Sequence, residues 1–426
     1  MGKTFRAWDI DQPWLLPPSV RDFVPEGHIA HFIRDTVREE LDLSRVLDCY
    51  SEERGYPPYH PVMMTALLLY SYCQGVYSSR RIAKACEARV DFMAVTGMSK
   101  PDFRTISDFR KRHLQALKGL FIQVLRLCQK AGLVTLGHVA LDGTKIKANA
   151  SKHKAMSYGR MCKAESELRA EIDRWFTRAD TDDRTEDDRY GKDRRGDEMP
   201  EWVVNKQKRL EKIREAKVAL EAEAKEKAQA EGKNGDKPDD KAQKNFTDPE
   251  SRIMKVGNGF EQCYNAQAAV EADSQIIVSQ TLTNAANDKQ QFDPMLVEIK
   301  KNMGRHAEEI SADAGYCSED NLKKANQRHV NAYVATGRQK HGEAAATGSK
   351  TGKIGTRVRA MMIKLKQGGH NSRYRLRKQT VEPVFGQIKQ GRGFRQFLMR
   401  GREKVAGEWA MVCIAHNLLK LATVSA

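Results

Sequence analysis

The stretch HVALDGTKIKA, residues 138–148, decides the fold that we expect for this chain of 426 residues. Its first four residues are mainly apolar, as in a buried strand, and the apolar run ends at Asp142 and Gly143. Residues 144–148 alternate between polar and apolar side chains, so they form either the continuation of this strand or its partner. The stretch therefore predicts a sheet in which a carboxylate lies at a strand end, held rigidly by the backbone.

Two more acidic residues lie at structural boundaries. Asp313 follows the short run 309–312 and precedes Ala314 and Gly315, whereas Glu382 lies in a helical segment rich in Arg and Lys. Hard divalent cations prefer oxygen ligands, and two such ions can contact both sides of a phosphodiester. The three carboxylates are thus candidates for a pair of Mg²⁺ ions. A simpler explanation stays open for each aspartate, because Asp is also common in turns and at strand ends.

The balance of charge indicates a polyanionic partner. The chain carries 73 Lys and Arg against 56 Asp and Glu, a formal net charge of +17. Such an excess favours binding to phosphate groups through neutralisation and counterion release. Together with the candidate phosphodiester chemistry, this predicts DNA as the partner. On charge alone, a ribosome-associated or merely basic soluble protein is the alternative.

The cysteines and the apolar runs limit the class of protein. The eight cysteines occur singly, without a Cys-x-x-Cys pair, which argues against a zinc ribbon or a disulfide framework and favours reduced thiols. Residues 1–6 lack the apolar core of a signal peptide. The longest apolar run, residues 63–72, is too short to span a bilayer and is typical of a buried helix. We therefore expect a soluble, cytoplasmic protein with no membrane partner.

Residues 19–134 show helical patterns throughout. Prolines within residues 57–61 break the chain before the apolar helix at 63–72. Residues 75–81 and 102–112 each contain a helix start, with Ser or Asp as the capping residue. Two interpretations stay open for this region: a helix-turn-helix DNA reader, and a helical bundle with a solvated basic face.

Strand patterns begin at about residue 135. A hairpin is expected from two runs, 266–271 and 275–279, around a turn. The expected elements that follow are a helix at 288–301, the strand ending at Asp313, a helix at 318–327 and a strand at 330–334. Three early strands followed by helix–strand alternation predict a mixed sheet covered by helices. Asp288 is a further acidic residue, which we expect to cap the helix that it begins.

A long charged insertion, residues 152–244, separates the first strand from the hairpin. An apolar stripe runs along it through Leu210, Ile213, Ala216 and Leu220. So narrow a stripe suits an antiparallel helical hairpin, although a single solvated helix stays open. Two stretches have the composition of flexible links, residues 232–238 and residues 340–353.

Three segments carry a resemblance to a known family: residues 141–151, 312–316 and 381–389. Together they resemble bacterial insertion-sequence transposases of the DDE superfamily. Supporting runs are residues 75–80, 101–110, 247–249, 264–267, 394–397 and 400–401. The resemblance extends from about Pro17 to Leu421. It implies a ribonuclease-H-like mixed sheet with flanking helices, in which Asp142, Asp313 and Glu382 form a catalytic, metal-binding triad.

The family also implies the activity and the partners. Two Mg²⁺ ions, with Mn²⁺ as a substitute, would serve DNA cleavage and strand transfer at the element's ends. Asp142 would contact both ions, and Asp313 and Glu382 one each. The expected partners are terminal inverted repeats, target DNA and a second copy of the chain, in the nucleoid-associated cytoplasm. A nuclease without strand transfer, and an inactive DNA-binding repressor of transposition, are the alternatives.

The same resemblance suggests a division into domains. Residues 1–134 would form an all-α N-terminal DNA-binding domain. Residues 135–151 and 245–426 would form the ribonuclease-H-like catalytic domain, and residues 152–244 a charged helical insertion.

Many relatives carry a signature around the glutamate: Tyr, two residues, Arg, three residues, Glu, six residues, Lys. Lys389 matches its last position, whereas Arg375 and Lys378 replace the Tyr and the Arg. Tyr374 and Arg377 are each one residue away from those positions. We expect Lys389 to position a phosphate, with Lys378 or Arg377 as helpers. A solvated basic helix face is the alternative.

A basic run follows this signature. Arg392, Arg395 and Arg400 are expected to contact DNA, and two phenylalanines, Phe394 and Phe397, could line the path of a strand or belong to the core. His416, in the last helix, has the spacing of a packing residue.

Overall fold

The computed structural model describes residues 19–50, 57–190, 201–231, 237–257, 259–338, 345–348 and 354–425. The two predicted flexible links lie mostly outside the described residues. The parts outside are residues 232–236, 340–344 and 349–353. Within the described part of the chain, no helix is long and apolar enough to cross a membrane.

The N-terminal region is helical, as the sequence predicts. Its elements are η1 (Val20–Phe23), α1 (Ile29–Asp35), η2 (Thr36–Glu40), α2 (Ser44–Leu47), α3 (Pro61–Cys73), α4 (Ser79–Ala88), α5 (Val90–Thr96), α6 (Phe103–Arg112) and α7 (Leu114–Lys130). The apolar run in α3 is buried on nearly every side, since neighbouring helices surround it. Asp102 caps α6 by accepting the backbone N–H groups of Arg104 and Thr105, whereas Ser78 precedes α4 without a side-chain cap bond.

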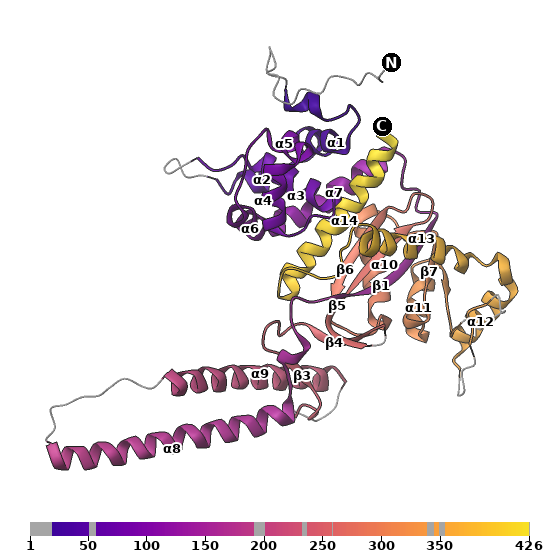
Figure 1. Cartoon of the computed structure of the whole chain (residues 1–426). Coiled ribbons are helices and arrows are strands. Elements are labelled where there is room, and N and C mark those ends of the chain that lie inside the picture. Colours follow the sequence, from indigo (N-terminus) through magenta and orange to yellow (C-terminus); the bar gives the residue numbers. More distant parts are fainter. Residues whose placement is uncertain are drawn as a thin grey trace, which may run out of the picture.

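A mixed sheet forms the second part of the molecule (Figure 1). Its strands are β1 (His138–Lys147), β4 (Arg252–Val256), β5 (Gly259–Glu271), β6 (Ile277–Thr283), β7 (Glu309–Ala312) and β8 (Asn331–Val334). β1 pairs antiparallel with β5 on one side and parallel with β7 on the other, and β8 continues the parallel part. The other edge of β5 is shared, because its first half pairs with β4 and its second half with β6. The predicted hairpin and the predicted helix–strand alternation are confirmed.

The prediction that Asp142 lies at a strand end is wrong. Residues 144–148 are the continuation of the strand, so Asp142 lies in the middle of β1. The reason is the unequal length of its two partners. Pairing with β5 continues to Lys147, whereas pairing with β7 stops at Leu141 opposite Ala312. Asp142 is therefore still paired with β5, opposite Ala268, but it lies one residue beyond the last pair with β7.

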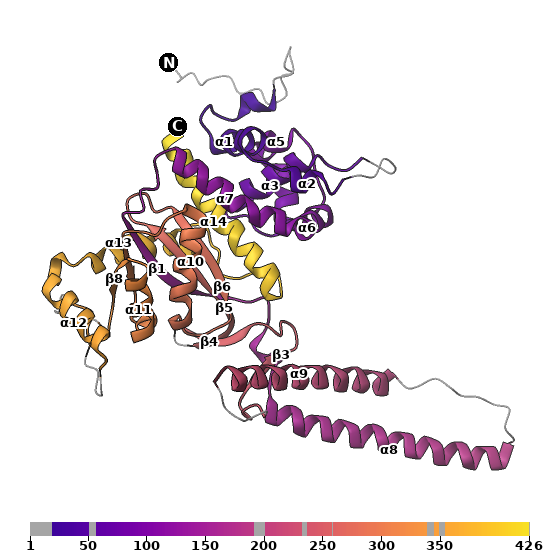
Figure 2. The same ribbon diagram turned by 180° about the vertical axis from the view of Figure 1, so that it is seen from behind.

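Helices cover the sheet and join it to the N-terminal region. α14 (Arg402–Ser425) packs against β6 on one side and against α3 and α7 on the other (Figure 1; Figure 2). The buried apolar side chains of both regions form one continuous core, in which Trp409 is fully buried. The other helices of this second region are η4 (Lys289–Gln291), α10 (Phe292–Met303), η5 (Ala314–Tyr316), α11 (Glu319–Gln327), α12 (Thr356–Gly368), η6 (Gly369–Asn371), η7 (Arg373–Arg375), α13 (Leu376–Gly386) and η8 (Gln387–Gly391).

The charged insertion forms a helical hairpin that projects from the rest of the molecule (Figure 2). It comprises η3 (Lys152–Lys154), β2 (Ala155–Ser157), α8 (Tyr158–Tyr190), α9 (Glu201–Glu231) and β3 (Gln243–Asn245). β2 pairs antiparallel with β3 at its base, and the four residues of the predicted apolar stripe are buried. Three of them, Ile213, Ala216 and Leu220, form a small separate core with Tyr158 and Met161. The hairpin interpretation is thus confirmed over the single helix.

Glu223 anchors the hairpin to the sheet. Its carboxylate accepts hydrogen bonds from Lys244 at 2.8 Å and, through both oxygens, from Arg252 of β4 at 2.8 and 2.9 Å. Burial opposes ionisation of Glu223, but the two cations outweigh it and lower its pKa. We expect Glu223→Ala to weaken the base by about 1 kcal/mol, since the group is partly exposed. Faster amide hydrogen exchange in β2 and β3 is the expected result.

The matched control is Glu226→Ala, one turn further along the exposed side of α9. If the amides of β2 and β3 exchange at equal rates in the two variants, the contacts of Glu223 do not stabilise the base of the hairpin.

Candidate active site

The register of the sheet brings the two predicted aspartates together. Leu141 and Ala312 form the last pair between the parallel strands β1 and β7, so Asp142 and Asp313 occupy the next position on each. The chain leaves β7 at Asp313, whose Oδ1 accepts the N–H of Gly315 at 2.8 Å. The carboxylates of Asp142 and Asp313 therefore lie at the same edge of the β1–β7 pairing. The Asp142 side chain is 13 % exposed.

α13 adds an arginine between the carboxylates. The Arg377 guanidinium donates to Asp142 Oδ2 at 2.8 Å and to Glu382 Oε1 at 2.9 Å. Arg377 is largely buried, whereas the Glu382 side chain is 48 % exposed. Glu382 therefore lies on a helix, as predicted, but on the far side of the guanidinium. In the described residues, no three acidic, His or Cys side chains converge closely enough to hold a metal ion.

The negative charge at this place is only partly neutralised. Burial raises the pKa of Asp142 to about 7; Arg377 lowers it in part and Asp313 raises it further. Burial likewise raises the pKa of Asp313, which Arg377 lowers and Asp288 raises. Carboxylates that are largely removed from water near a single guanidinium are costly to ionise together.

These donors fit a divalent cation. They are hard oxygen ligands with surplus negative charge, which is what Mg²⁺ or Mn²⁺ requires. Arg377 places one positive charge between Asp142 and Glu382. Convergence of the three carboxylates on a metal therefore requires the Arg377 side chain to move away.

Asp288 belongs to this cluster, so its prediction as a helix cap is wrong. It lies at the N-cap position before η4 but makes no side-chain cap hydrogen bond. Its Oδ1 instead accepts from Asn265 Nδ2 at 2.7 Å and from Gln267 Nε2 at 2.6 Å. The sequence shows an acid before a helix, and a cap is the ordinary interpretation. Only the contact between β5 and the chain that follows β6 directs this carboxylate toward the site.

The signature lysine lies beside β1, within electrostatic reach of Asp142. Lys389 Nζ donates to the carbonyl oxygen of Lys145 in β1 at 2.9 Å, and burial lowers the pKa of Lys389. Lys389 lies in η8, a π-helical segment that directly follows α13. Lys378 lies on the exposed surface of α13.

The other basic residues predicted to contact DNA divide into two groups. Arg395 and Arg400 are exposed; Arg395 donates to the carbonyl oxygen of Lys389, and Arg400 to that of Asn149. Arg392 is partly buried, with its guanidinium 3.3 Å from His416 Nδ1. Most of its surface faces protein, so its position favours a packing role.

The two phenylalanines belong to the core. Phe394 and Phe397 are 1 % and 0 % exposed and pack edge to face against each other. Of the two interpretations, the core one is therefore confirmed. His416 is also a packing residue, as predicted: its Nε2 lies 2.8 Å from the Gln275 carbonyl oxygen, and burial together with Arg392 lowers its pKa to about 3.

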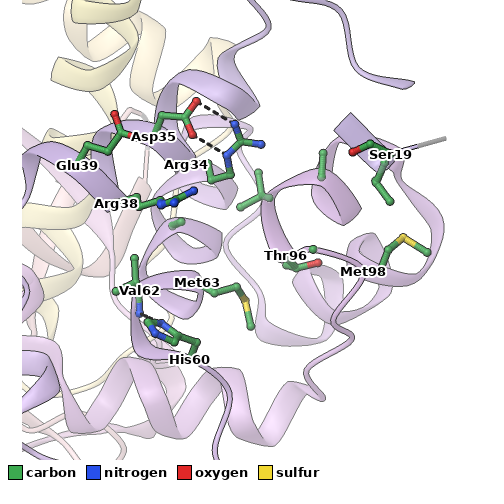
Figure 3. Close-up of a pocket in the computed structure, with 15 residues that line it drawn as sticks. Ser19, Arg34, Asp35, Arg38, Glu39, His60, Val62, Met63, Thr96 and Met98 are labelled. Carbon is green, nitrogen blue, oxygen red and sulfur yellow. Dashed lines mark hydrogen bonds and ion pairs between the residues drawn. The ribbon is translucent and has the colours of Figure 1, made fainter. Parts of the chain in front are cut away.

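A separate surface groove of about 830 Å³ lies among the N-terminal helices (Figure 3). Arg34 on its wall is paired with Asp35 at 2.7 Å, and the His60 ring accepts the N–H of Val62. Its described acids, Asp35 and Glu39, lie beside arginines, and Asp35 is already neutralised. Among the described residues, the groove therefore contains no cluster of carboxylates that could hold a metal ion.

Comparison with known families finds two transposase domains in the chain. Residues 18–112 match a transposase domain (DUF772), and residues 234–418 match a transposase DDE domain. No curated protein and no solved structure matches the chain. Paired aspartates in a helix-covered mixed sheet, next to a helical N-terminal region, are consistent with a DNA transposase. The chain belongs to the DDE superfamily of insertion-sequence transposases.

Proposed function

We propose that this transposase cleaves DNA at the ends of its element and joins those ends to target DNA, using two Mg²⁺ ions. One observation carries the proposal: Asp142 and Asp313 lie at neighbouring positions on parallel strands, in a place where their charge is not balanced. Asp142, Asp313 and Glu382 would hold the ions, and Mn²⁺ would substitute for Mg²⁺. When bound, the ions would activate the attacking oxygen and stabilise the leaving oxygen.

The order of the strands supports a ribonuclease-H-like core. The antiparallel strands β1, β5 and β6 come first along the chain, and the parallel strands β7 and β8 follow. Helix α10 connects β6 to β7, and α11 connects β7 to β8. We propose the corresponding division into a helical region at 1–134, a catalytic domain at 135–151 and 245–426, and an insertion at 152–244.

The chain's own residues would divide the work. The sheet fixes the positions of Asp142 and Asp313. Glu382 belongs to α13, and its carboxylate is held by the hydrogen bond from Arg377. A DNA phosphate near α13 would compete with the carboxylates for the Arg377 guanidinium. Withdrawal of Arg377 would then free Asp142 and Glu382 together. DNA binding and assembly of the site would therefore be one event.

Other basic residues would hold the DNA backbone. Lys389 lies beside β1, and Lys378, Arg395 and Arg400 are exposed on the segments around it. Contacts of this kind position phosphates without reading sequence. We propose that the partners are terminal inverted repeats and target DNA, bound by a homodimer in the nucleoid-associated cytoplasm.

The proposal is tested with a duplex that carries the inverted repeats flanking the element. We expect cleavage and joined products with Mg²⁺ or Mn²⁺, and neither with EDTA, because the carboxylates alone supply no Lewis acid. Pre-cut ends should also be joined. Cleavage without joining would indicate a nuclease, and binding without any chemistry would indicate a repressor.

A further inference from the structure

We infer that Asp288 is a fourth carboxylate of this site and that it holds one of the metal ions together with Asp313. The inference rests on the proposed function and adds a residue to it. Asp288 follows β6 and lies outside the three segments that carry the family resemblance.

The carboxylate of Asp288 is held in a fixed orientation. Asn265 and Gln267, two residues apart on one face of β5, both donate to Oδ1. Gln267 is fully buried and is itself held by the hydroxyl of Tyr316. A polar network of this kind beneath a carboxylate is typical of groups that orient a metal ligand.

Two glycines show how closely the site surrounds Asp288. Gly143 follows Asp142, and a Cβ at this position would collide with Asp288 Oδ1 and with the Gln267 amide. Gly315 follows Asp313 by two residues, and a Cβ there would lie 3.3 Å from Asp288 Oδ2. The backbone segments after both aspartates therefore approach the Asp288 carboxylate.

The second oxygen of Asp288 and one carboxylate oxygen of Asp313 both lie close to Gly315. Asp288 Oδ2 and Asp313 Oδ1 lie 3.3 and 3.0 Å from the same Cβ position at Gly315. Within the described residues, Oδ2 accepts no hydrogen bond, and neither aspartate forms an ion pair, since Arg377 pairs with Asp142 and Glu382. A cation bound between the two carboxylates would offset their repulsion, and a hard divalent ion suits these oxygens.

The test measures Mn²⁺ binding to the full chain, by the electron paramagnetic resonance of free Mn²⁺. The comparison includes four proteins: wild type, Asp288→Asn, Asp313→Asn and the control Asp320→Asn. Each is measured with and without the additional substitution Arg377→Ala, which removes competition by the guanidinium. Asp320 is exposed on α11, paired only with Lys324 in the described structure. We expect Asp288→Asn to lower Mn²⁺ affinity at least about tenfold, like Asp313→Asn, and Asp320→Asn to leave it unchanged.

Urea unfolding in EDTA separates binding from folding. Asparagine keeps the Oδ1 acceptor and removes repulsion from Asp313, so Asp288→Asn should be at least as stable as wild type. If it unfolds, Asp288→Ser replaces it in the binding measurement.

The outcomes distinguish the inference from the function on which it rests. Wild-type affinity in Asp288→Asn, with a loss in Asp313→Asn, would overturn the role of Asp288 alone. No Mn²⁺ binding by wild type or by Arg377→Ala would overturn the metal site as a whole, and Asp288 with it.

Discussion

Asp142→Asn is expected to abolish DNA cleavage while making the metal-free protein more stable at pH 8. Loss of this carboxylate removes a contact to the ions, and the several kcal/mol that metal ions supply to such reactions correspond to a rate loss of about 10³-fold or more. Stability changes in the opposite direction because asparagine carries no charge to bury, and because Arg377 keeps its second ion pair, with Glu382. Opposite effects on activity and stability are characteristic of residues kept for function.

The effect on stability has a defined dependence on pH. Burial raises the pKa of Asp142 from 3.8 to about 7, so the folded protein holds this proton more tightly than the unfolded chain does. Wild-type stability therefore falls as the pH rises from about 4 to 7, and stays at its lower value above that window. The advantage of Asp142→Asn should grow over the same window, to no more than about 4 kcal/mol.

Urea unfolding in EDTA between pH 5 and pH 8 measures this difference, and Mg²⁺-dependent cleavage of element-end DNA measures the activity. Asp320→Asn is the control, with both quantities expected to match wild type. A variant that is inactive and also less stable at pH 8 would contradict the assignment, since Asp142 would then act as an ordinary structural residue.

Arg377→Ala is expected to lower the free energy of unfolding by about 3 kcal/mol or more at pH 8 in EDTA. Removing one partner of a buried ion pair leaves the other charge without compensation, which typically costs about 3–5 kcal/mol. Arg377 and Asp142 are 11 % and 13 % exposed, so the pair is close to this limit. Mg²⁺ should restore much of the loss, because the ion supplies the missing positive charge.

The control is Arg375→Ala, two residues earlier. Arg375 is exposed and contacts His370, so its removal should change stability by less than about 0.5 kcal/mol, with or without Mg²⁺. If Arg377→Ala loses stability and Mg²⁺ does not restore it, the prediction is contradicted. Arg377 would then stabilise the fold by packing, and its charge would not take the place of a metal ion.

Local patterns determined much of the fold. The hairpin around residues 272–274, the strand ending at Asp313 and the apolar stripe of α9 were all predictable, because periodicity and turn residues act over a few positions. The resemblance to DDE transposases, carried by short motifs, is confirmed by the two family matches. The sequence also identified the carboxylates of Asp142 and Asp313 as candidates, although it placed Asp142 at a strand end.

What the tertiary structure alone decided is which side chains meet. The registers of β1 with β7 and of β5 with β1 place Asp142, Asp313 and Asp288 in one cluster, although up to 171 residues separate them along the chain. Arg377 lies between Asp142 and Glu382 because α13 packs across β1. Local signals describe the backbone of one segment, whereas burial, repulsion and ion pairing depend on segments brought together by the sheet. For that reason a residue that resembles a helix cap in the sequence becomes a carboxylate of the site in the fold.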